Sequence, residues 1–355
     1  MKASKNYMNN IRALVTGGAG YYGSHLLQIL SANKSIKLGS LDINPPLEIN
    51  DNIKFHKADI RDKTLLSKII PEYDIIFHNI AQVPLAKNNS LFWDVNVEGT
   101  KNICNISLEC GIKRLIYTSS SAIYGVPKSN PVSENTKPFP KEAYGVAKLE
   151  GEKICFEYSK LGLPVTIIRP RTILGHGRLG IFSILFSWIE QGVNIPVLNN
   201  GKNIYQFIHS DDLANATILS VKTKENFNSY NIGSENFGTM RDALENLCQY
   251  ANTGSKVYSL PMKPIEIIMN ITSKLNLTPL APYHALMYGR SLYFDISKAK
   301  KELGFLPKYS TDEMLQQSYN CYINEKSKTD FKDDKSIHQK SIQENLLKIF
   351  RIYKG

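Results

Sequence analysis

Two side chains with complementary chemistry, Tyr144 and Lys148, stand four residues apart in the segment Tyr-Gly-Val-Ala-Lys. On a helix this spacing puts both on one face, about 5 to 6 Å apart at Cβ. A phenol has a free pKa near 10, so it becomes a base at neutral pH only where positive charge stabilises the phenolate. Such a pair also occurs by chance as two solvated side chains. With a cofactor and a serine nearby, however, it suits the oxidation of an alcohol, because the tyrosine can take the hydroxyl proton.

The elements around this pair bring serines to the same place. The apolar segment from Lys113 to Ser119 is expected to be a strand, and it runs directly into Ser120 and Ser121. Tyr144 lies near the start of a helix expected from Lys141 to Leu161. In a doubly wound sheet both features fall at the carboxyl edge of the strands, where ligands bind.

A glycine-rich turn near the N-terminus predicts what binds there. An apolar run ends at Thr16 and leads into Gly17, Gly20 and Gly23, after which apolar residues recur at helical spacing. A strand, tight turn and helix of this kind let the backbone approach a diphosphate. Asp42 follows at the end of the next apolar segment, where a carboxylate can bind a ribose diol. Such a string is a weak signal alone, but this context predicts dinucleotide binding.

Short apolar strands alternate with helical patterns through the first half of the chain. Further strands are expected at Asn52 to Ala58, Tyr73 to Asn79 and Val165 to Arg169, with a long helix from about Leu91 to Cys110. This alternation predicts an α/β fold with a doubly wound parallel sheet. Beyond Pro170 the pattern becomes irregular, which predicts a smaller mixed α/β substrate domain.

We therefore expect a nucleotide-binding core over 10–175, to which segments around 204–233 return, and a mainly substrate-binding domain over 176–325. Helices are expected near Ile181 to Gln191, Asp211 to Val221, Met240 to Ala251 and Ile265 to Leu275.

Bulk properties exclude several classes of protein. The 355 residues include five scattered cysteines without a Cys-x-x-Cys pair, which argues against structural zinc and disulfides. The formal charge of +11 is spread along the chain, so we expect an anionic small substrate and no nucleic acid. No stretch approaches the roughly 18 apolar residues that a bilayer span needs, and no secretory signal is evident. The expected location is the cytoplasm.

The last 30 residues differ from the rest. Residues 326–335 are highly charged and predict a linker, whereas Ser336 to Lys354 places Ile342, Leu346 and Phe350 at helical spacing among basic residues. We expect a basic amphipathic helix in this C-terminal part, 326–355. Docking on the protein's own body is favoured over contact with a membrane surface.

Several motifs in a fixed order make the chain resemble a known family. They are Thr-Gly-Gly-Ala-Gly-Tyr-Tyr-Gly, Asp42, Asp59, His-Asn-Ile-Ala ending at Ala81, Asn96, Ser-Ser-Ser-Ala-Ile-Tyr-Gly, Tyr-Gly-Val-Ala-Lys, Arg169-Pro170, the run Phe207 to Ala214 and the run Asp295 to Tyr309. Together they are similar to the extended short-chain dehydrogenase/reductases of the NAD-dependent epimerase/dehydratase type, in particular the UDP-glucose/galactose 4-epimerases. The resemblance covers about Ile11 to Asn324.

The resemblance implies a Rossmann-type domain and roles for individual residues. Tyr144 would be the catalytic acid/base, Lys148 its partner and a ribose ligand, and Ser121 the contact for the substrate hydroxyl. Cofactor contacts are implied for Gly17, Gly20, Tyr21, Tyr22, Gly23, Asp42, Asp59, Ile60, Ala81, Asn96, Ser119, Tyr144, Lys148 and Pro170. The cofactor is expected to be NAD, since Asp42 would repel a 2′-phosphate. The helices at 91–110 and 141–161 imply a homodimer.

The identity of the substrate is less constrained. Sugar dehydratases typically carry an acid where Ser119, Ser120 and Ser121 stand here, so we expect an epimerase of a nucleotide-activated sugar. Arg171 and Thr172 occupy the place of a usual asparagine. Candidate substrate residues are Ser121, Thr172, Arg178 and Arg290, with Arg171 a further candidate phosphate ligand.

Two alternatives stay open. The region around Gly201 also resembles the 3β-hydroxysteroid dehydrogenase branch, which predicts a net dehydrogenase or reductase of an apolar or lipid-linked alcohol. A non-catalytic NAD-binding protein is disfavoured by the intact Ser121, Tyr144 and Lys148. His209 and His176 are expected to be structural.

Overall fold

The computed structural model describes residues 10–46, 50–82, 93–274, 287, 289–326 and 352–353. Its largest feature is a seven-stranded sheet with the strand order β10-β6-β5-β4-β1-β2-β3, in which every pairing is parallel. The strands are β1 (Arg12–Thr16), β2 (Lys37–Asp42), β3 (Ile53–Lys57), β4 (Ile75–His78), β5 (Arg114–Thr118), β6 (Val165–Pro170) and β10 (Phe227–Ile232).

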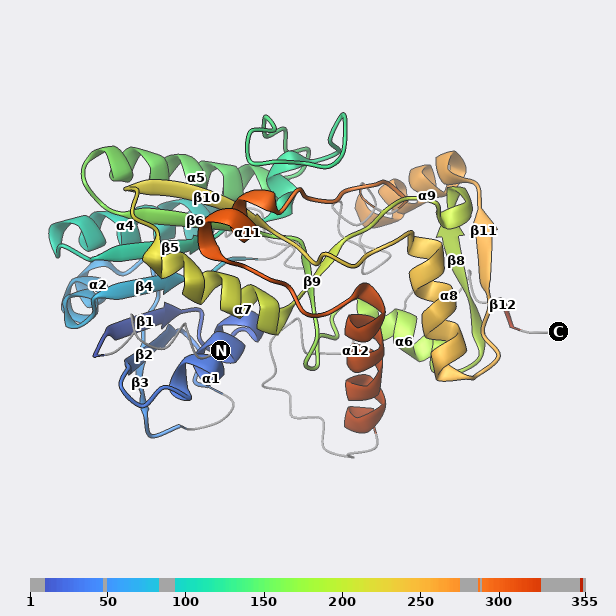
Figure 1. Ribbon diagram of the computed structural model, residues 1–355, viewed down its shortest axis with the longest axis horizontal. Helices are drawn as coiled ribbons and strands as arrows, with labels where there is room; N and C mark the ends of the chain where they lie inside the picture. Colours follow the sequence, from blue (N-terminus) through green and yellow to red (C-terminus); the bar gives the residue numbers. More distant parts are fainter. Residues whose placement is uncertain are drawn as a thin grey trace.

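Helices cover both faces of this sheet, as Figure 1 shows. One face packs against α1 (Tyr21–Ser31), α7 (Ser210–Leu219) and α11 (Ser297–Leu303). The other packs against α2 (Lys63–Ile69), α4 (Thr100–Glu109) and α5 (Ala143–Lys160). Because both faces are covered, β4, β5 and β6 are buried throughout their length, which explains why their sequences are mainly apolar.

The predicted fold class is confirmed. The strand order reverses between β1 and β4, which is the topological switch point where doubly wound sheets bind ligands. The helix expected at 91–110 has two parts among the described residues, a π-helical stretch η2 (Asp94–Gly99) and then α4, which ends shortly before Gly111 with its φ of +65°. Residues 91 and 92 lie outside the described part.

The rest of the chain builds a second lobe with its own core. It contains α6 (Phe182–Glu190), α8 (Met240–Ala251), α9 (Met262–Lys274) and α12 (Thr311–Lys326), and a three-stranded sheet of β8 (Val193–Leu198), β11 (Val257–Leu260) and β12 (Ile352–Tyr353). In Figure 1 this lobe occupies the end of the molecule opposite α4 and the first strands. A parallel pair, β7 (Thr172–Leu174) and β9 (Phe207–His209), lies between the lobe and the large sheet.

Short helical turns complete the secondary structure. They are η1 (Ile70–Glu72), η3 (Ser121–Tyr124), η4 (Asn199–Gly201) and η5 (Ser220–Lys222). Among the residues that the structure describes, none of the helices combines the length and apolar character that crossing a membrane requires.

The C-terminal segment requires a correction. Ile352 and Tyr353, expected within the amphipathic helix, form β12, which pairs antiparallel with β8. The physical reason is that the edge of β8 offers unpaired backbone groups, and a neighbouring strand satisfies them. The remainder of the predicted linker and helix lies outside the described residues.

Candidate active site

The glycine loop between β1 and α1 is shaped so that side chains cannot be added to it. Gly17 has a φ of +76°, and a Cβ at Gly23 would lie 2.0 Å from the Gly17 carbonyl oxygen. Helix α1 begins after Gly20 with no side-chain cap and no acidic residue in its first turn. Its first N–H groups are therefore available to an anion, and the loop fits the diphosphate of a dinucleotide.

Asp42 ends β2 beside this loop. One carboxylate oxygen accepts a hydrogen bond from the Ala19 N–H (3.1 Å) and the other from the Asn44 N–H (3.0 Å). Asp42 is thus fixed at the carboxyl edge of the sheet, next to the turn where the dinucleotide would bind. This placement suits its predicted role toward a ribose.

A cavity of about 470 Å³ opens at the carboxyl ends of the strands and extends into the second lobe. It brings together most of the residues predicted from the sequence to bind ligands: Gly17, Gly20, Tyr21, Tyr22, Gly23, Ala81, Ser119, Ser121, Tyr144, Lys148, Pro170, Thr172 and Arg178. The glycine loop and the Ser/Tyr/Lys group therefore face one space.

Asp42 is not among the lining residues, and four further predicted residues also lie outside the cavity lining and have contacts of their own. Asp59 forms an ion pair with Arg61 (2.6 Å), while Ile60 is buried beneath Gly99. The Asn96 amide binds the backbone N–H and oxygen of Gln82 (2.8 and 3.1 Å). It supports the segment after β4 rather than facing a ligand directly.

Arg290, the fourth of these residues, was predicted to bind substrate. Its guanidinium pairs with Glu266 at 2.6 Å, and the residue does not line the cavity. A charge already paired to a carboxylate is a poor anion ligand, so the geometry does not support that role.

Helix α5 begins so that Tyr144 and Lys148 project from its first turns into the cavity. The carboxylate of Glu142 accepts hydrogen bonds from the N–H groups of Tyr144 (2.8 Å) and Gly145 (2.7 Å), which caps the helix. The Lys148 ammonium donates to the Thr118 carbonyl oxygen at 2.7 Å and lies 4.8 Å from the ring centroid of Tyr117. The cap and this bond set where the side chains of Tyr144 and Lys148 lie.

Burial governs the acidity of both groups. Burial raises the pKa of Tyr144 to about 12, although a hydrogen bond with Ser120 and the positive charge of Arg178 act in the opposite direction. Burial lowers the pKa of Lys148 to about 7. The cation that acts on Tyr144 in this structure is therefore Arg178, a residue that the sequence marked only as a substrate contact.

The sequence marked Arg171 as a candidate phosphate ligand but did not show its contact with Ser121. Arg171 is 1 % exposed, and its Nη1 donates to the Ser121 hydroxyl at 2.8 Å. Its Nε and Nη2 have no hydrogen-bond partner in the described structure. The available signal was its position directly after the predicted sixth strand, at the carboxyl edge of the sheet.

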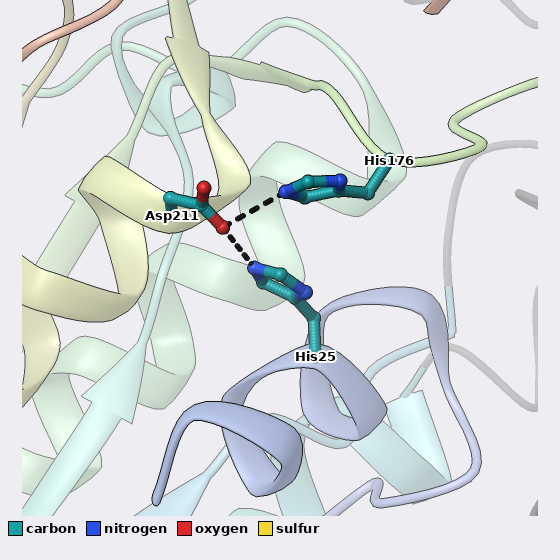
Figure 2. A group of neighbouring side chains, drawn as sticks. All are labelled: His25, His176 and Asp211. Carbon is teal, nitrogen blue, oxygen red and sulfur yellow. Dashed lines mark hydrogen bonds and ion pairs between the residues drawn. The ribbon is translucent and has the colours of Figure 1, made fainter. Parts of the chain in front are cut away.

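A cluster of histidines fastens the loop after β7 to the nucleotide-binding core. Figure 2 shows His25 of α1 and His176 of that loop reaching the same Asp211 oxygen from two sides, at 2.6 and 3.0 Å. His209 stacks on Tyr309 with ring centroids 3.7 Å apart, and its side chain accepts the N–H of Asp211. None of the three histidines lines the cavity, so the geometry supports the structural roles expected for His176 and His209.

A doubly wound parallel sheet, a glycine loop at its switch point and a Ser/Tyr/Lys group on the same cavity define an NAD-binding enzyme of the extended short-chain dehydrogenase/reductase class. The chain belongs to the NAD dependent epimerase/dehydratase family, whose model matches residues 13–233. Its cofactor is NAD.

Individual relatives share most of the chain. It is 51% identical over 312 residues to the uncharacterized protein y4nG of Sinorhizobium fredii. The alignment covers 87% of this chain and 78% of that protein. It is 24% identical to the 3beta-hydroxysteroid-dehydrogenase/decarboxylase isoform 2 of Arabidopsis thaliana over 87% of this chain, but only 61% of that protein is covered. The crystal structure of UDP-glucuronic acid 4-epimerase from Bacillus cereus in complex with NAD matches with a TM-score of 0.73 at 25% identity, over 88% of this chain and 99% of that one.

Proposed function

We propose that the protein is an NAD-dependent epimerase of a nucleotide-activated sugar, which oxidises a ring hydroxyl to a ketone and then reduces it from the opposite face. The observation that carries the proposal is that Ser121, Tyr144 and the glycine loop line one cavity. The similarity to a UDP-glucuronic acid 4-epimerase over nearly the whole of that chain supports the same class of substrate.

The side chains at the tip of β5 and on α5 would divide the chemistry among them. Tyr144 takes the proton of the reacting hydroxyl and returns it when the ketone is reduced. Ser121 binds the same substrate oxygen and fixes its position. Bound NAD supplies the hydride acceptor and donor next to these groups. Lys148 would hold the cofactor side of the site, and Arg178 keeps positive potential around the phenol.

Elimination of water needs an acid that can protonate the departing hydroxyl. In the described part of the chain, neither Asp nor Glu lines the cavity, and the three residues at the tip of β5 are serines. This composition favours epimerisation over dehydration.

A second candidate is a net dehydrogenase or reductase of an apolar or lipid-linked alcohol. One observation favours it: the part of the cavity wall that belongs to the second lobe consists mainly of aliphatic and aromatic side chains, among them Leu185, Ile195 and Leu244. The two reactions differ in redox balance, because an epimerase regenerates its cofactor in every cycle.

The test is incubation of the purified protein with NAD and a panel of UDP-, GDP-, CDP- and dTDP-sugars. Epimers detected by NMR, without accumulation of absorbance at the NADH wavelength, would support the epimerase. Stoichiometric NADH with an alcohol substrate would support the dehydrogenase instead. Tyr144→Phe is the control, since it keeps the cavity but removes the base.

We also propose that the protein forms a homodimer through α5 and the neighbouring η2–α4 segment. The outer surface of α5 carries exposed apolar side chains, including Val146, Phe156 and Leu161, and Trp93 lies exposed just before η2. Apolar side chains gathered on paired helices are suited to a helical interface. Light scattering of the wild type and of Phe156→Glu tests this, with a monomeric variant as the expected result.

A further inference from the structure

The cavity has two chemically different ends. Around the sheet its lining includes the hydroxyls of Ser121 and Tyr144 and the ammonium of Lys148. In the second lobe the lining side chains come mainly from α6, β8, α8, β11 and α9, which lie together at one end of the molecule (Figure 1). Every one of these side chains is apolar except for the indole N–H of Trp188. We call this second end the apolar chamber.

The composition of the chamber limits what can occupy it. A nucleobase is selected by donors and acceptors that match its edge, whereas the chamber side chains offer a single N–H group, that of Trp188. A hydrocarbon gains about 25 cal/mol for each Å² removed from water and needs no polar partner. The chamber therefore suits an alkyl or isoprenoid group better than a polar one.

Two arginines, Arg171 and Arg178, line the same cavity. Arg171 contacts the Ser121 hydroxyl, and Arg178 stacks over the Tyr21 ring with its guanidinium carbon 5.2 Å from the centroid. Arg178 also comes three residues before Ile181, a residue of the chamber wall.

Both guanidinium groups have unused hydrogen-bonding capacity. Nε and Nη2 of Arg171 and Nε of Arg178 are buried without partners, and no carboxylate among the described residues forms an ion pair with either. Burying a cation without an anion is costly, and a ligand anion would remove that cost. Arg171 in particular is 1 % exposed and lies at the cavity wall. Each of the two guanidinium groups therefore has donors with which it can bind a phosphate or carboxylate.

We propose that the substrate is an anionic amphiphile. Its reacting hydroxyl lies against Ser121 and Tyr144, its phosphate or carboxylate binds Arg171 and Arg178, and a hydrocarbon chain fills the apolar chamber. The inference rests on the proposed function in that the catalytic end oxidises a hydroxyl. It develops the second candidate of the proposed function, an apolar or lipid-linked alcohol, by adding an anionic group to that substrate.

The test measures binding rather than turnover. The full chain with NAD is titrated calorimetrically with butyl, hexyl, octyl and decyl phosphate below their micelle concentrations. Affinity is expected to rise about threefold to fourfold for each added methylene until the chamber is full. Because Trp188 lines the chamber, its fluorescence should change with the same midpoint. An affinity independent of chain length would overturn the proposal, and this measurement needs no variant.

Two probes that each lack one part of decyl phosphate test the arginines. Decanol lacks the anion, and inorganic phosphate lacks the alkyl chain. Decanol and inorganic phosphate should each bind at least tenfold more weakly than decyl phosphate, and decanoate shows whether a carboxylate serves as well. Arg171→Met should remove the preference for the anion and leave decanol binding unchanged. Equal affinity for decanol and both anions in the wild type would overturn the assignment of the anion site.

A matched pair of variants tests the chamber itself. Ile265 of α9 lines the cavity, whereas Ile267 on the same helix is 60 % exposed and does not. In Ile265→Gln the gain in affinity from butyl to decyl phosphate should be at least tenfold smaller than in the wild type. In Ile267→Gln this gain should match that of the wild type. Equal behaviour of the two variants would overturn the proposal.

The two levels of inference fail separately. Epimerisation of a nucleotide sugar without any binding of alkyl anions would overturn the amphiphile and leave the proposed function standing. An intact alkyl phosphate series, with no epimerisation of any nucleotide sugar, would support the amphiphile and remove the nucleotide sugar from the proposed function.

Discussion

The ammonium of Lys148 donates a hydrogen bond of 2.7 Å to the carbonyl oxygen of Thr118, the last residue of β5. This bond joins helix α5 to the carboxyl edge of the sheet. The ammonium is buried beside the ring of Tyr117, and no carboxylate of the described residues forms an ion pair with it to offset its desolvation. Lys148 therefore occupies its position at a cost to stability, and that cost depends on pH.

The first prediction concerns this pH dependence. Burial lowers the pKa of Lys148 from 10.5 to about 7, so between pH 7 and about 10 the unfolded chain holds a proton that the folded protein has released. The free energy of unfolding should therefore rise with pH across this window. Urea unfolding of the cofactor-free wild type and Lys148→Met at pH 6.5, 7.5, 8.5 and 9.5 measures it. The free energy of unfolding of the wild type should increase relative to that of Lys148→Met as pH rises. A difference between the two proteins that stays constant with pH would contradict the prediction.

The second prediction concerns the base. Tyr144→Phe removes the phenol oxygen and leaves the ring, so turnover should fall by about 10²- to 10⁴-fold, the contribution of a general acid–base group. The affinity for NAD should stay within about threefold of the wild type. Steady-state rates and NAD titration of the same preparation measure both quantities. Persistent turnover would show that another group is the base.

Local spacing explains what the sequence could predict. The glycine turn, the switch-point topology and the Tyr144–Lys148 pair depend on residues close together in the chain, and hydrophobic periodicity located every strand of the large sheet up to β6. The predicted helix Met240 to Ala251 agrees with α8 at both ends. For these features, local geometry determines the three-dimensional arrangement.

Contacts between segments that are distant in the chain explain which features could not be predicted from the sequence. The bond from Arg171 to Ser121 joins residues 50 positions apart, and the apolar chamber is assembled from α6, β8, α8, β11 and α9. Helical periodicity marks Ile265 as apolar but does not show whether it faces a core or a ligand. The strand β12 likewise forms because β8 lies beside it, which no local pattern reveals.

The third prediction concerns the glycine loop. In Gly23→Ala the new methyl group would meet the backbone of Gly17 at 2.0 Å, a clash that no rotation of a side chain relieves. NAD affinity should fall at least tenfold, and the thermal stabilisation produced by a fixed NAD concentration should be smaller than in the wild type. Gly238→Ala is the matched control, because its nearest neighbour lies at 3.8 Å. Differential scanning fluorimetry with and without NAD compares them, and an unchanged NAD response in Gly23→Ala would refute the assignment.

The fourth prediction concerns the histidine cluster of Figure 2. The hydrogen bond to Asp211 raises the pKa of His176 above 6.5. A raised pKa stabilises the folded protein fully below the unfolded value of 6.5, and that stabilisation is lost as pH rises through the folded pKa. The difference in free energy of unfolding between the wild type and His176→Gln should therefore be larger at pH 5.5 than at pH 8.5, in favour of the wild type. Chemical denaturation at the two pH values tests the sign, and a larger difference at pH 8.5 would contradict it.

The last prediction separates two neighbouring serines. A hydrogen bond with Ser120 lowers the pKa of Tyr144, whereas Ser121 is bonded to Arg171 and is proposed to bind the substrate oxygen. Ser120→Ala should therefore raise the pKa of Tyr144 and move the rising limb of the rate profile to higher pH. Ser121→Ala should lower kcat about tenfold or more at every pH without moving that limb. The pH profiles of kcat/KM for both variants test this assignment. If the rising limb moves in Ser121→Ala and not in Ser120→Ala, the roles of the two serines are the reverse of those proposed.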